Sequence, residues 1–224
     1  DRAFIEARKD SAAELAALTD LGELAPRHLV ANALAAAALV RAYGVEPAAV
    51  RDGIRNYNPG AHRIQKVAEI DGVLWVNDSK ATNPHAAAAS LAAFSSVVWI
   101  AGGLSKGVDY SELVAAHSGR LKAVVVIGQD STGLLAALER HAPDVPVITV
   151  PARDTDNGEP VGGDEHVTGG KIMASAVAAA AGIAVDGDTV LMAPAAASMD
   201  QFTSYAHRGD AFIEAVRGIQ EGQA

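Results

Sequence analysis

From about residue 60 onward, short apolar runs rich in β-branched residues alternate with stretches of helical periodicity. Short apolar runs bounded by turn residues predict strands, and longer periodic stretches predict helices. Strands that alternate with helices predict an α/β fold, a mostly parallel sheet with helices on both faces. The strand candidates are 64–70, 73–77, 97–101, 123–127, 145–150 and 189–192, and the helix candidates are 83–94, 109–117, 131–140 and 172–181, with a last helix after Ser198.

The first 60 residues follow a different pattern. Leucines among alanines after Pro26 predict one helix that ends near Gly44, and Pro47 opens a second helix that reaches Tyr57. Asn58-Pro59-Gly60 then interrupts the chain. We therefore expect a domain boundary there, with residues 1–59 on one side and residues 60–224 on the other.

The segment 153–170 differs in composition from its surroundings. It contains five glycines and five acidic residues but one arginine. Such a composition cannot bury much apolar surface, so it predicts a surface loop.

Composition excludes several kinds of partner. Half of the 224 residues are hydrophobic and the net charge is −9, so the chain has an ordinary core and no electrostatic reason to bind nucleic acid. The absence of cysteine excludes disulfides and thiolate metal sites and fits a reducing cytoplasm.

The ends of the chain and its apolar runs give no sign of a membrane anchor. The Ala-rich run 31–40 is about half the length of the roughly 20 residues that a membrane span needs. The start has neither a signal segment nor a methionine, so we expect a soluble, cytoplasmic chain whose N-terminus has been cut.

Three loops that follow predicted strands carry the candidate chemistry: 77–83, 102–107 and 194–198. Because the carboxyl ends of parallel strands meet at one edge of a sheet, we expect these loops to lie together. Each leads into a predicted helix start. Asn83 and Pro84 fit the N-cap and first position, and the other two starts resemble capping boxes, Asp109 with Glu112 and Ser198 with Gln201.

Helix N-termini and lysines at one edge predict an anion site. Helix N-termini present free N–H donors and partial positive charge, and Lys80 and Lys106 add two cations. Carboxylate and phosphate both fit. The alternative is purely structural: Lys80 and Lys106 as solvated lysines, Ser198 as a simple cap, and Gly102-Gly103 as a sharp turn. The dinucleotide pattern G-x-G-x-x-G is absent.

Taken in order, four motifs resemble the C-terminal domain of the Mur ligases. They are His62-Arg63, N-D-S-K-A-T-N at 77–83, Gly102-Gly103 with Lys106, and P-A-A-A-S-M-D-Q-F at 194–202. No motif is specific alone, but the set in this order is. The match runs from about Arg27 to Gly218 and is nearest to the members that add D-glutamate.

The resemblance implies a domain arrangement. Residues 1–59 would be the helical C-terminal remnant of a central P-loop ATPase domain, and residues 60–224 a Rossmann-like domain that binds the incoming amino acid. The P-loop pattern G-x-x-x-x-G-K-[ST] does not occur in this sequence. We therefore expect the phosphate cradle and most ATP and Mg²⁺ ligands upstream, and the chain alone to be inactive.

The resemblance also implies the reaction. ATP phosphorylates the carboxylate of UDP-N-acetylmuramoyl-L-alanine, and the amine of D-glutamate attacks the acyl phosphate to give an amide, a step of peptidoglycan synthesis. The expected cofactors are ATP and Mg²⁺, and the expected partners are these small molecules, without nucleic acid or membrane. We expect a monomer.

Residue roles follow from the same resemblance. D-glutamate carries two carboxylates, so its site needs cations and N–H donors. Lys80 is assigned as catalytic, on the substrate or phosphate side, and no residue as a metal ligand. The D-glutamate residues would be Thr82, Lys106, Ser198, Met199 and Tyr205, and the nucleotide residues Asn32, Arg63 and Asp78.

Two departures from the family pattern and two alternative functions remain. His28 is followed by Leu29 where the family commonly has Asn, and Tyr205 stands where Phe is frequent. The chain could instead be a non-catalytic Rossmann-like module that binds an anion or nucleotide, or part of a Mur ligase that adds another amino acid. A P-loop elsewhere in the parent protein would separate an enzyme from a binding module.

Overall fold

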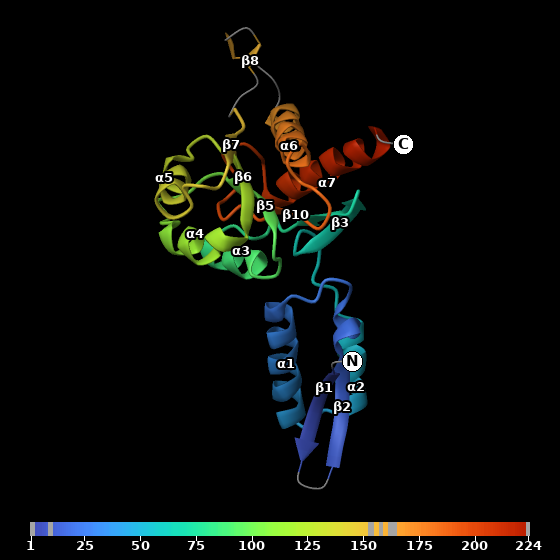
Figure 1. The fold of residues 1–224 in the computed structure, drawn as a ribbon. Coiled ribbons are helices and arrows are strands. Elements are labelled where there is room, and N and C mark those ends of the chain that lie inside the picture. Colours follow the sequence, from blue (N-terminus) through green and yellow to red (C-terminus); the bar gives the residue numbers. More distant parts are fainter. Residues whose placement is uncertain (1–2, 9–10, 152–154, 157–158, 161–164, 223–224) are drawn as a thin grey trace. The chain divides into compact units, whose positions relative to one another are not determined.

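A computed structural model of the chain describes residues 3–8, 11–151, 155–156, 159–160 and 165–222 (Figure 1). The chain divides into two compact units, Asp1–Gly60 and Ala61–Ala224. The predicted interruption at 58–60 coincides with the end of the first unit. No helix in the described ranges is both long and apolar enough to span a membrane.

The first unit consists of a β-hairpin and two helices. α1 (Arg27–Ala42) begins after Pro26, and α2 (Pro47–Arg55) has its proline at the first helical position, as predicted. The sequence pattern does not predict the hairpin, because its many alanines blur the apolar–polar alternation of a strand. Its strands are antiparallel and lead into a short 3-10 helix: β1 (Ala3–Arg8), β2 (Ser11–Ala17) and η1 (Leu18–Leu21).

The second unit contains a six-stranded sheet in the order β3-β4-β10-β5-β6-β7. Only β3 is antiparallel to its neighbour, so the predicted α/β fold with a mostly parallel sheet is confirmed. The strands are β3 (Gln65–Ile70), β4 (Val73–Asn77), β5 (Val97–Gly102), β6 (Leu121–Ile127), β7 (Val147–Thr149) and β10 (Thr189–Met192). The helices are α3 (Pro84–Leu91), α4 (Ser111–His117), α5 (Thr132–His141), α6 (Glu165–Ala181) and α7 (Tyr205–Gly222), with a short 3-10 helix η2 (Ser118–Arg120).

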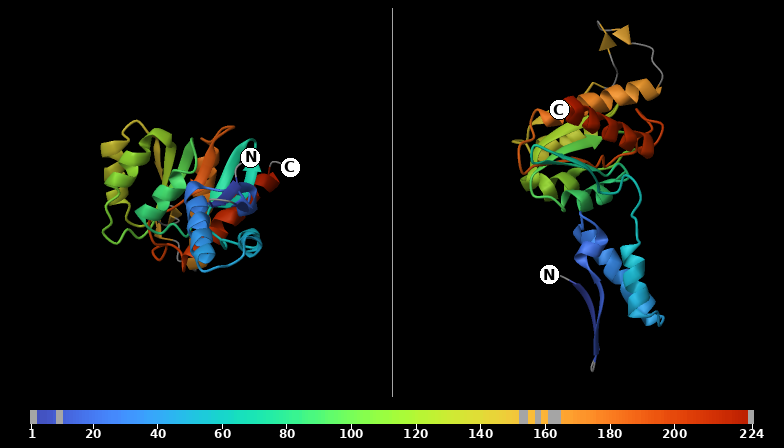
Figure 2. Two further views of the ribbon diagram at one scale, coloured as in Figure 1. Left: turned by 90° about the horizontal axis from the view of Figure 1, so that it is seen from below. Right: turned by 90° about the vertical axis from the view of Figure 1, so that its right-hand side faces the viewer.

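Helices cover both faces of this sheet. α6 and α7 lie on one face, and α3, α4 and α5 lie on the other (Figures 1 and 2). Every residue of β5 and β10 is buried, which explains why these strands are continuous apolar runs instead of alternating ones. Alternate residues such as Val98 and Ile100 pack against Met173 of α6 and Phe212 of α7 in one core cluster.

Two local predictions are confirmed. Asp71 and Gly72 join β3 to β4 with φ of 50° and 74°, the left-handed pair that a tight hairpin turn requires. Asn83 caps α3, since its side-chain oxygen accepts a hydrogen bond from the N–H of Ala86 at 2.9 Å, and Pro84 follows at the first helical position.

The predicted loop 153–170 is wrong over its last part, and residues 152–154, 157–158 and 161–164 lie outside the described residues. α6 already begins at Glu165, and two short strands, β8 (Thr155–Asp156) and β9 (Glu159–Pro160), pair before it. Gly169 shows why glycine occurs inside this helix. A Cβ there would lie 2.9 Å from both the carbonyl oxygen of Gln201 and the ring of Phe202, so the glycine permits close packing.

The predicted helix start at Ser198 is also wrong. The carbonyl of Ser198 accepts hydrogen bonds from the N–H groups of Gln201 and Phe202, which gives a single turn, and α7 begins only at Tyr205. The hydroxyl of Ser204 accepts from the N–H of His207 at 3.0 Å and so performs the capping that was predicted for Ser198.

The capping box predicted at Asp109 and Glu112 does not form either. α4 begins at Ser111, and its N-cap residue, Tyr110, makes no side-chain capping bond. The Asp109 carboxylate instead accepts a hydrogen bond from the N–H of Ser111 at 2.8 Å. This Asx turn, two residues apart, takes the place of the predicted bond to the N–H of Glu112.

The glycine at the end of β5 provides a test of how tightly the strand ends pack. Gly102 has a φ of 109°, and a Cβ there would lie 2.0 Å from the carbonyl oxygen of Ile127. Gly102→Ala should therefore lower the free energy of unfolding by at least about 2 kcal/mol, measured by denaturant titration. Gly119→Ala is the control, because no atom lies within 4 Å of its Cβ position, and it should change stability by less than about 0.5 kcal/mol. Equal effects of the two substitutions would contradict this packing.

Candidate functional site

The loops after β4, β5 and β10 meet at one edge of the sheet, as predicted. β10 lies between β4 and β5, so its loop occupies the middle position. On one side, the N–H of Ala195 donates to the carbonyl of Ala81 at 2.9 Å. On the other side, the N–H of Gly102 donates to the carbonyl of Pro194 at 2.8 Å. Backbone bonds therefore continue the sheet pairing beyond the strands.

A second connection joins the loops after β5 and β10. Leu104 and Ala197 form an isolated antiparallel bridge, with N–H to oxygen distances of 2.9 and 3.2 Å. At Gly103, a Cβ would lie 2.3 Å from the carbonyl oxygen of Ala197, so only glycine allows this approach. The sharp turn at Gly102-Gly103 therefore brings the loop that carries Lys106 into contact with the loop that carries Ser198.

Left-handed backbone conformations gather around these loops. Among residues other than glycine in the described ranges, positive φ occurs at the β3–β4 turn residue Asp71 and at four residues of these loops or bonded to them: His62, Ile64, Lys106 and Ala195. Such conformations are costly for a residue with a side chain and tend to cluster at functional sites.

Asp78, at the start of the loop after β4, is 7% exposed and connects several segments by hydrogen bonds. One carboxylate oxygen accepts from the N–H of Ile64 at 3.3 Å, and the other accepts from the hydroxyl of Ser90. The N–H of Asp78 donates to the carbonyl of Met192 at 2.8 Å, which ties the β4 loop to the end of β10.

His62 is held in one tautomer by its neighbours. The amide oxygen of Asn77 accepts from the N–H of Ser79, so its nitrogen must donate, to the carbonyl of Gly209 at 3.2 Å and to Nδ1 of His62 at 3.0 Å. The His62 proton therefore resides on Nε2, which lies 3.7 Å from the carboxylate of Asp210. A Cβ on Gly209 would come within 2.2 Å of Nδ1, so the glycine makes room for the ring.

Lys80 and Tyr205 come together from distant parts of the chain. The Lys80 ammonium lies 3.7 Å from the centroid of the Tyr205 ring, a cation–π contact. Hydrogen bonding and charge from Lys80, and the more distant charge of Arg63, hold the pKa of Tyr205 below its usual value against the opposing effect of burial. The ring of His62 lies edge to face with that of Tyr205, with 6.3 Å between the centroids.

The remaining predicted D-glutamate residues lie on the same three loops with different exposure. Lys106 is exposed, Thr82 is half-buried, Ser198 is 3% exposed and Met199 is 65% exposed. The loops thus offer a free ammonium, hydroxyls and backbone N–H groups, which are the groups that bind a carboxylate.

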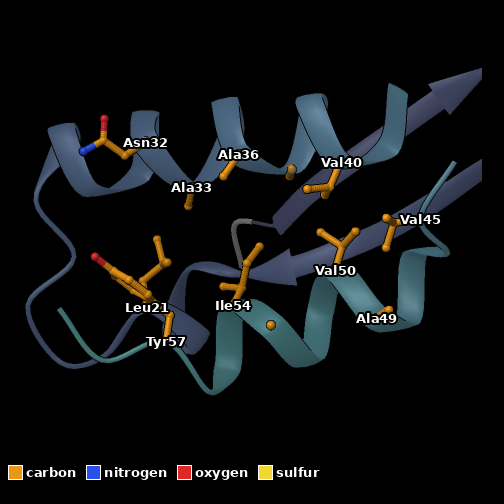
Figure 3. A pocket seen from close by; sticks show the side chains of 12 residues that line it. Leu21, Asn32, Ala33, Ala36, Val40, Val45, Ala49, Val50, Ile54 and Tyr57 are labelled. Atoms are coloured by element: carbon orange, nitrogen blue, oxygen red, sulfur yellow. The ribbon is translucent and has the colours of Figure 1, made fainter. Parts of the chain in front are cut away.

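The predicted nucleotide residues do not all lie in one unit. Arg63 is exposed and follows His62 in the second unit, whereas Asn32 is exposed on α1 in the first. Asn32 lines a groove of about 410 Å³ between α1 and α2 (Figure 3). The other lining residues are apolar apart from Tyr57 and Gly53, so the groove lacks the cations that an anion would need.

Arg208, which the sequence prediction omitted, lies at the centre of the second unit's site. It is fully buried, and it donates to the hydroxyl and carbonyl oxygens of Ser79, each at 3.0 Å, and twice to the carbonyl of Ala196 at 3.2 Å. Burial lowers its pKa to about 10, which leaves it charged at neutral pH. The sequence offered one signal for this residue. Arg208 precedes Phe212 and Val216 by four and eight positions, which places its charge on the buried face of a helix.

A magnesium site does not fit the described residues. Within them, no group of three or more His, Asp or Glu side chains is arranged to hold a metal ion. The carboxylate of Asp78 accepts hydrogen bonds from the N–H of Ile64 and the hydroxyl of Ser90.

Comparison with known proteins identifies the family of this chain. Residues 62–196 match the family model of the Mur ligase glutamate ligase domain. The chain belongs to the Mur ligase family. This Mur ligase chain is 54% identical to the UDP-N-acetylmuramoylalanine–D-glutamate ligase of Streptomyces avermitilis and 57% identical to that of Thermobifida fusca, each over 219 residues and 98% of the chain. It spans 44% of the length of each relative.

Solved structures show the same fold. The pseudomurein peptide ligase type C of Methanothermus fervidus superposes with a TM-score of 0.61 at 16% identity, over 97% of this chain and 40% of that one. The UDP-N-acetylmuramate–alanine ligase of Thermotoga maritima superposes with a TM-score of 0.54 at 14% identity, over 86% of this chain and 38% of that one. Both the recognised family and the predicted fold are thus confirmed.

The Lys80–Tyr205 pair of this Mur ligase chain gives a pH prediction. The positive charge of Lys80 favours the phenolate, so Lys80→Gln should raise the pKa of Tyr205 toward its usual value. A titration of ¹³Cζ-labelled tyrosine followed by NMR measures this directly. Lys106→Gln removes an equal charge without that contact and should leave the Tyr205 pKa in place. A Tyr205 pKa that does not respond to Lys80→Gln would contradict the contact.

Proposed function

We propose that the protein to which this chain belongs is an ATP-dependent ligase that joins D-glutamate to UDP-N-acetylmuramoyl-L-alanine in peptidoglycan precursor synthesis. The observation that supports this most strongly is the identity of more than half of the aligned residues with two ligases of that name over 98% of the chain. A non-catalytic module has no comparable support, and neither does a ligase that adds another amino acid.

The amino-acid site in this proposal is the edge formed by the loops after β4, β5 and β10. D-glutamate brings two carboxylates, and this edge supplies the exposed ammonium of Lys106 and the half-buried Thr82. On the β10 side, Ser198 would donate its hydroxyl, and Met199 its backbone N–H. Tyr205 would provide an apolar wall for the methylene groups of D-glutamate beside these donors.

Lys80 would act on the side where the acyl phosphate reacts. Its ammonium is fixed over the Tyr205 ring, so the charge is positioned before substrate arrives. A positioned cation stabilises the negative charge that develops when the amine attacks and the phosphate leaves. We therefore assign Lys80 to that oxyanion or phosphate charge.

Arg63, Asp78 and Asn32 are the nucleotide residues in this proposal. Arg63 is exposed and can approach a phosphate or a ring face, whereas Asp78 is largely buried and would act on the nucleotide side through its negative charge. Asn32, on the first unit, keeps its predicted nucleotide role. ATP supplies the phosphoryl group, and the Mg²⁺ ligands and phosphate cradle are proposed to lie in the upstream part of the protein.

The cellular setting follows from the proposed substrates. UDP-N-acetylmuramoyl-L-alanine and ATP are cytoplasmic metabolites, and we propose a cytoplasmic enzyme that works as a monomer. Residues 1–59 would be the remnant of the ATP-binding domain, and residues 60–224 would be the amino-acid-binding domain.

An assay of the longer gene product tests the proposed function. Phosphate release from ATP should require both UDP-N-acetylmuramoyl-L-alanine and D-glutamate, and mass spectrometry should detect the amide product. Release that is unaffected by omission of D-glutamate, or that responds better to another amino acid, would contradict the proposal.

Substitution of Lys106 tests the amino-acid site. A hydrogen bond between a charged donor and a carboxylate contributes about 1.5–3 kcal/mol, so Lys106→Ala in the longer protein should raise the KM for D-glutamate by about 10- to 150-fold. Stability should hardly change, because the side chain is exposed.

Lys66→Ala serves as its matched control. Lys66 lies on β3 and pairs with Glu69 at 3.1 Å, a surface ion pair whose loss should leave the D-glutamate KM unchanged. If Lys106→Ala and Lys66→Ala give the same KM, Lys106 is an ordinary solvated lysine.

A further inference from the structure

Arg208 is a buried cation whose hydrogen bonds go to neutral oxygens. Arg208 is 0% exposed, and in the part of the chain that the structure describes no carboxylate lies within ion-pair distance of its guanidinium. Burial of a charge is costly, and an apolar side chain of similar volume often stabilises a fold as well or better. A buried arginine in this setting therefore does something that an apolar side chain would not do.

The partners of Arg208 show what that is. Its Nε and Nη2 donate to the hydroxyl and carbonyl of Ser79, in the loop after β4, and Nη1 and Nη2 donate to the carbonyl of Ala196, in the loop after β10. One planar, rigid group thus bridges two loops that lie more than a hundred residues apart in the sequence. A lysine has one nitrogen and no such fork.

Each anchored residue stands next to the proposed substrate groups. Ser79 directly precedes Lys80, and its hydroxyl also donates to the carbonyl of Tyr205 at 2.7 Å. Ala196 lies two residues before Ser198. The guanidinium is therefore bonded to the backbone of two loops of the proposed amino-acid site.

The third loop, which follows β5 and carries Lys106, contacts both Ala197 and Arg208. Ala197, next to Ala196, forms the bridge with Leu104, and a Cβ on Gly103 would lie 3.3 Å from Nη1 of Arg208. The loop that carries Lys106 therefore packs against Arg208 and against the loop after β10 to which Arg208 is bonded.

We propose that Arg208 is a positioning residue, whose bridge between Ser79 and Ala196 sets the distance between the Lys80 and Ser198 loops and so determines D-glutamate affinity. This inference rests on the proposed function for its kinetic consequence, but not for its structural one. Precise spacing matters because a shift of about 1 Å in a binding group can cost on the order of a hundredfold in rate.

The test is Arg208→Lys in the longer protein, with Arg217→Lys as control. Arg217 lies on the same helix but is exposed. Arg208→Lys keeps a positive charge and loses the fork, so the KM for D-glutamate should rise on the order of tenfold or more while the KM for ATP stays unchanged. Arg217→Lys should alter neither.

Amide hydrogen exchange on the same samples separates positioning from plain stability. In Arg208→Lys, peptides that cover 79–82 and 195–198 should exchange faster, while those of β5 keep their protection. If exchange accelerates uniformly and both KM values move together, or if nothing changes, Arg208 is not a positioning residue.

A second variant keeps the inference testable if Arg208→Lys does not fold. Ser79→Ala removes the acceptor of Nε and the donor to Tyr205 but leaves both carbonyl contacts, so it should shift KM and exchange in the same direction by less. Unchanged KM and exchange in Ser79→Ala would also overturn the proposal. Should the wild-type protein not use D-glutamate at all, the proposed function fails, and the exchange measurement alone decides the role of Arg208.

Discussion

The position of β10 between β4 and β5 is the constraint on which the rest of the site depends. It is the last described strand of this sheet in the sequence, yet it lies between β4 and β5, which follow one another along the chain, and it pairs with both. Its hydrogen bonds continue past its end, through Pro194 and Ala195, to the loops on either side. The three loops that carry Lys80, Lys106 and Ser198 thereby lie side by side at one edge of the sheet.

Hydrogen bonds of buried polar side chains then determine how these neighbouring loops are positioned. Apolar packing of β5, β6 and β10 against α6 and α7 stabilises the layers but is tolerant of small shifts. Asn77, Asp78 and Arg208 are different, because each has partners that must lie at hydrogen-bonding distance in defined directions. The energetic cost of burying them is offset by bonds that also specify where the loops lie. These hydrogen bonds thus hold the loops in defined positions relative to one another.

The sequence predicted those features that depend on local pattern and on parallel-sheet geometry. The strand runs, the Asp71-Gly72 turn, the Asn83 cap and the meeting of three loops all followed from periodicity, turn chemistry and the common edge of parallel strands. Capping at Ser198 and Asp109 failed, because a cap signature does not reveal whether the chain continues as a helix or closes in a single turn. Gly169, Asn77 and Arg208 escaped prediction because their roles depend on partners far away in sequence, which composition and spacing do not encode.

The most direct test of the account is a crystal structure of the longer protein with UDP-N-acetylmuramoyl-L-alanyl-D-glutamate bound. The central claim is that the loops after β4, β5 and β10 together form one carboxylate site. The account predicts that the D-glutamyl carboxylates lie within about 3 Å of donors from the Lys106 and Ser198 loops. Carboxylates bound wholly by other parts of the protein, with these loops remote from the ligand, would contradict it.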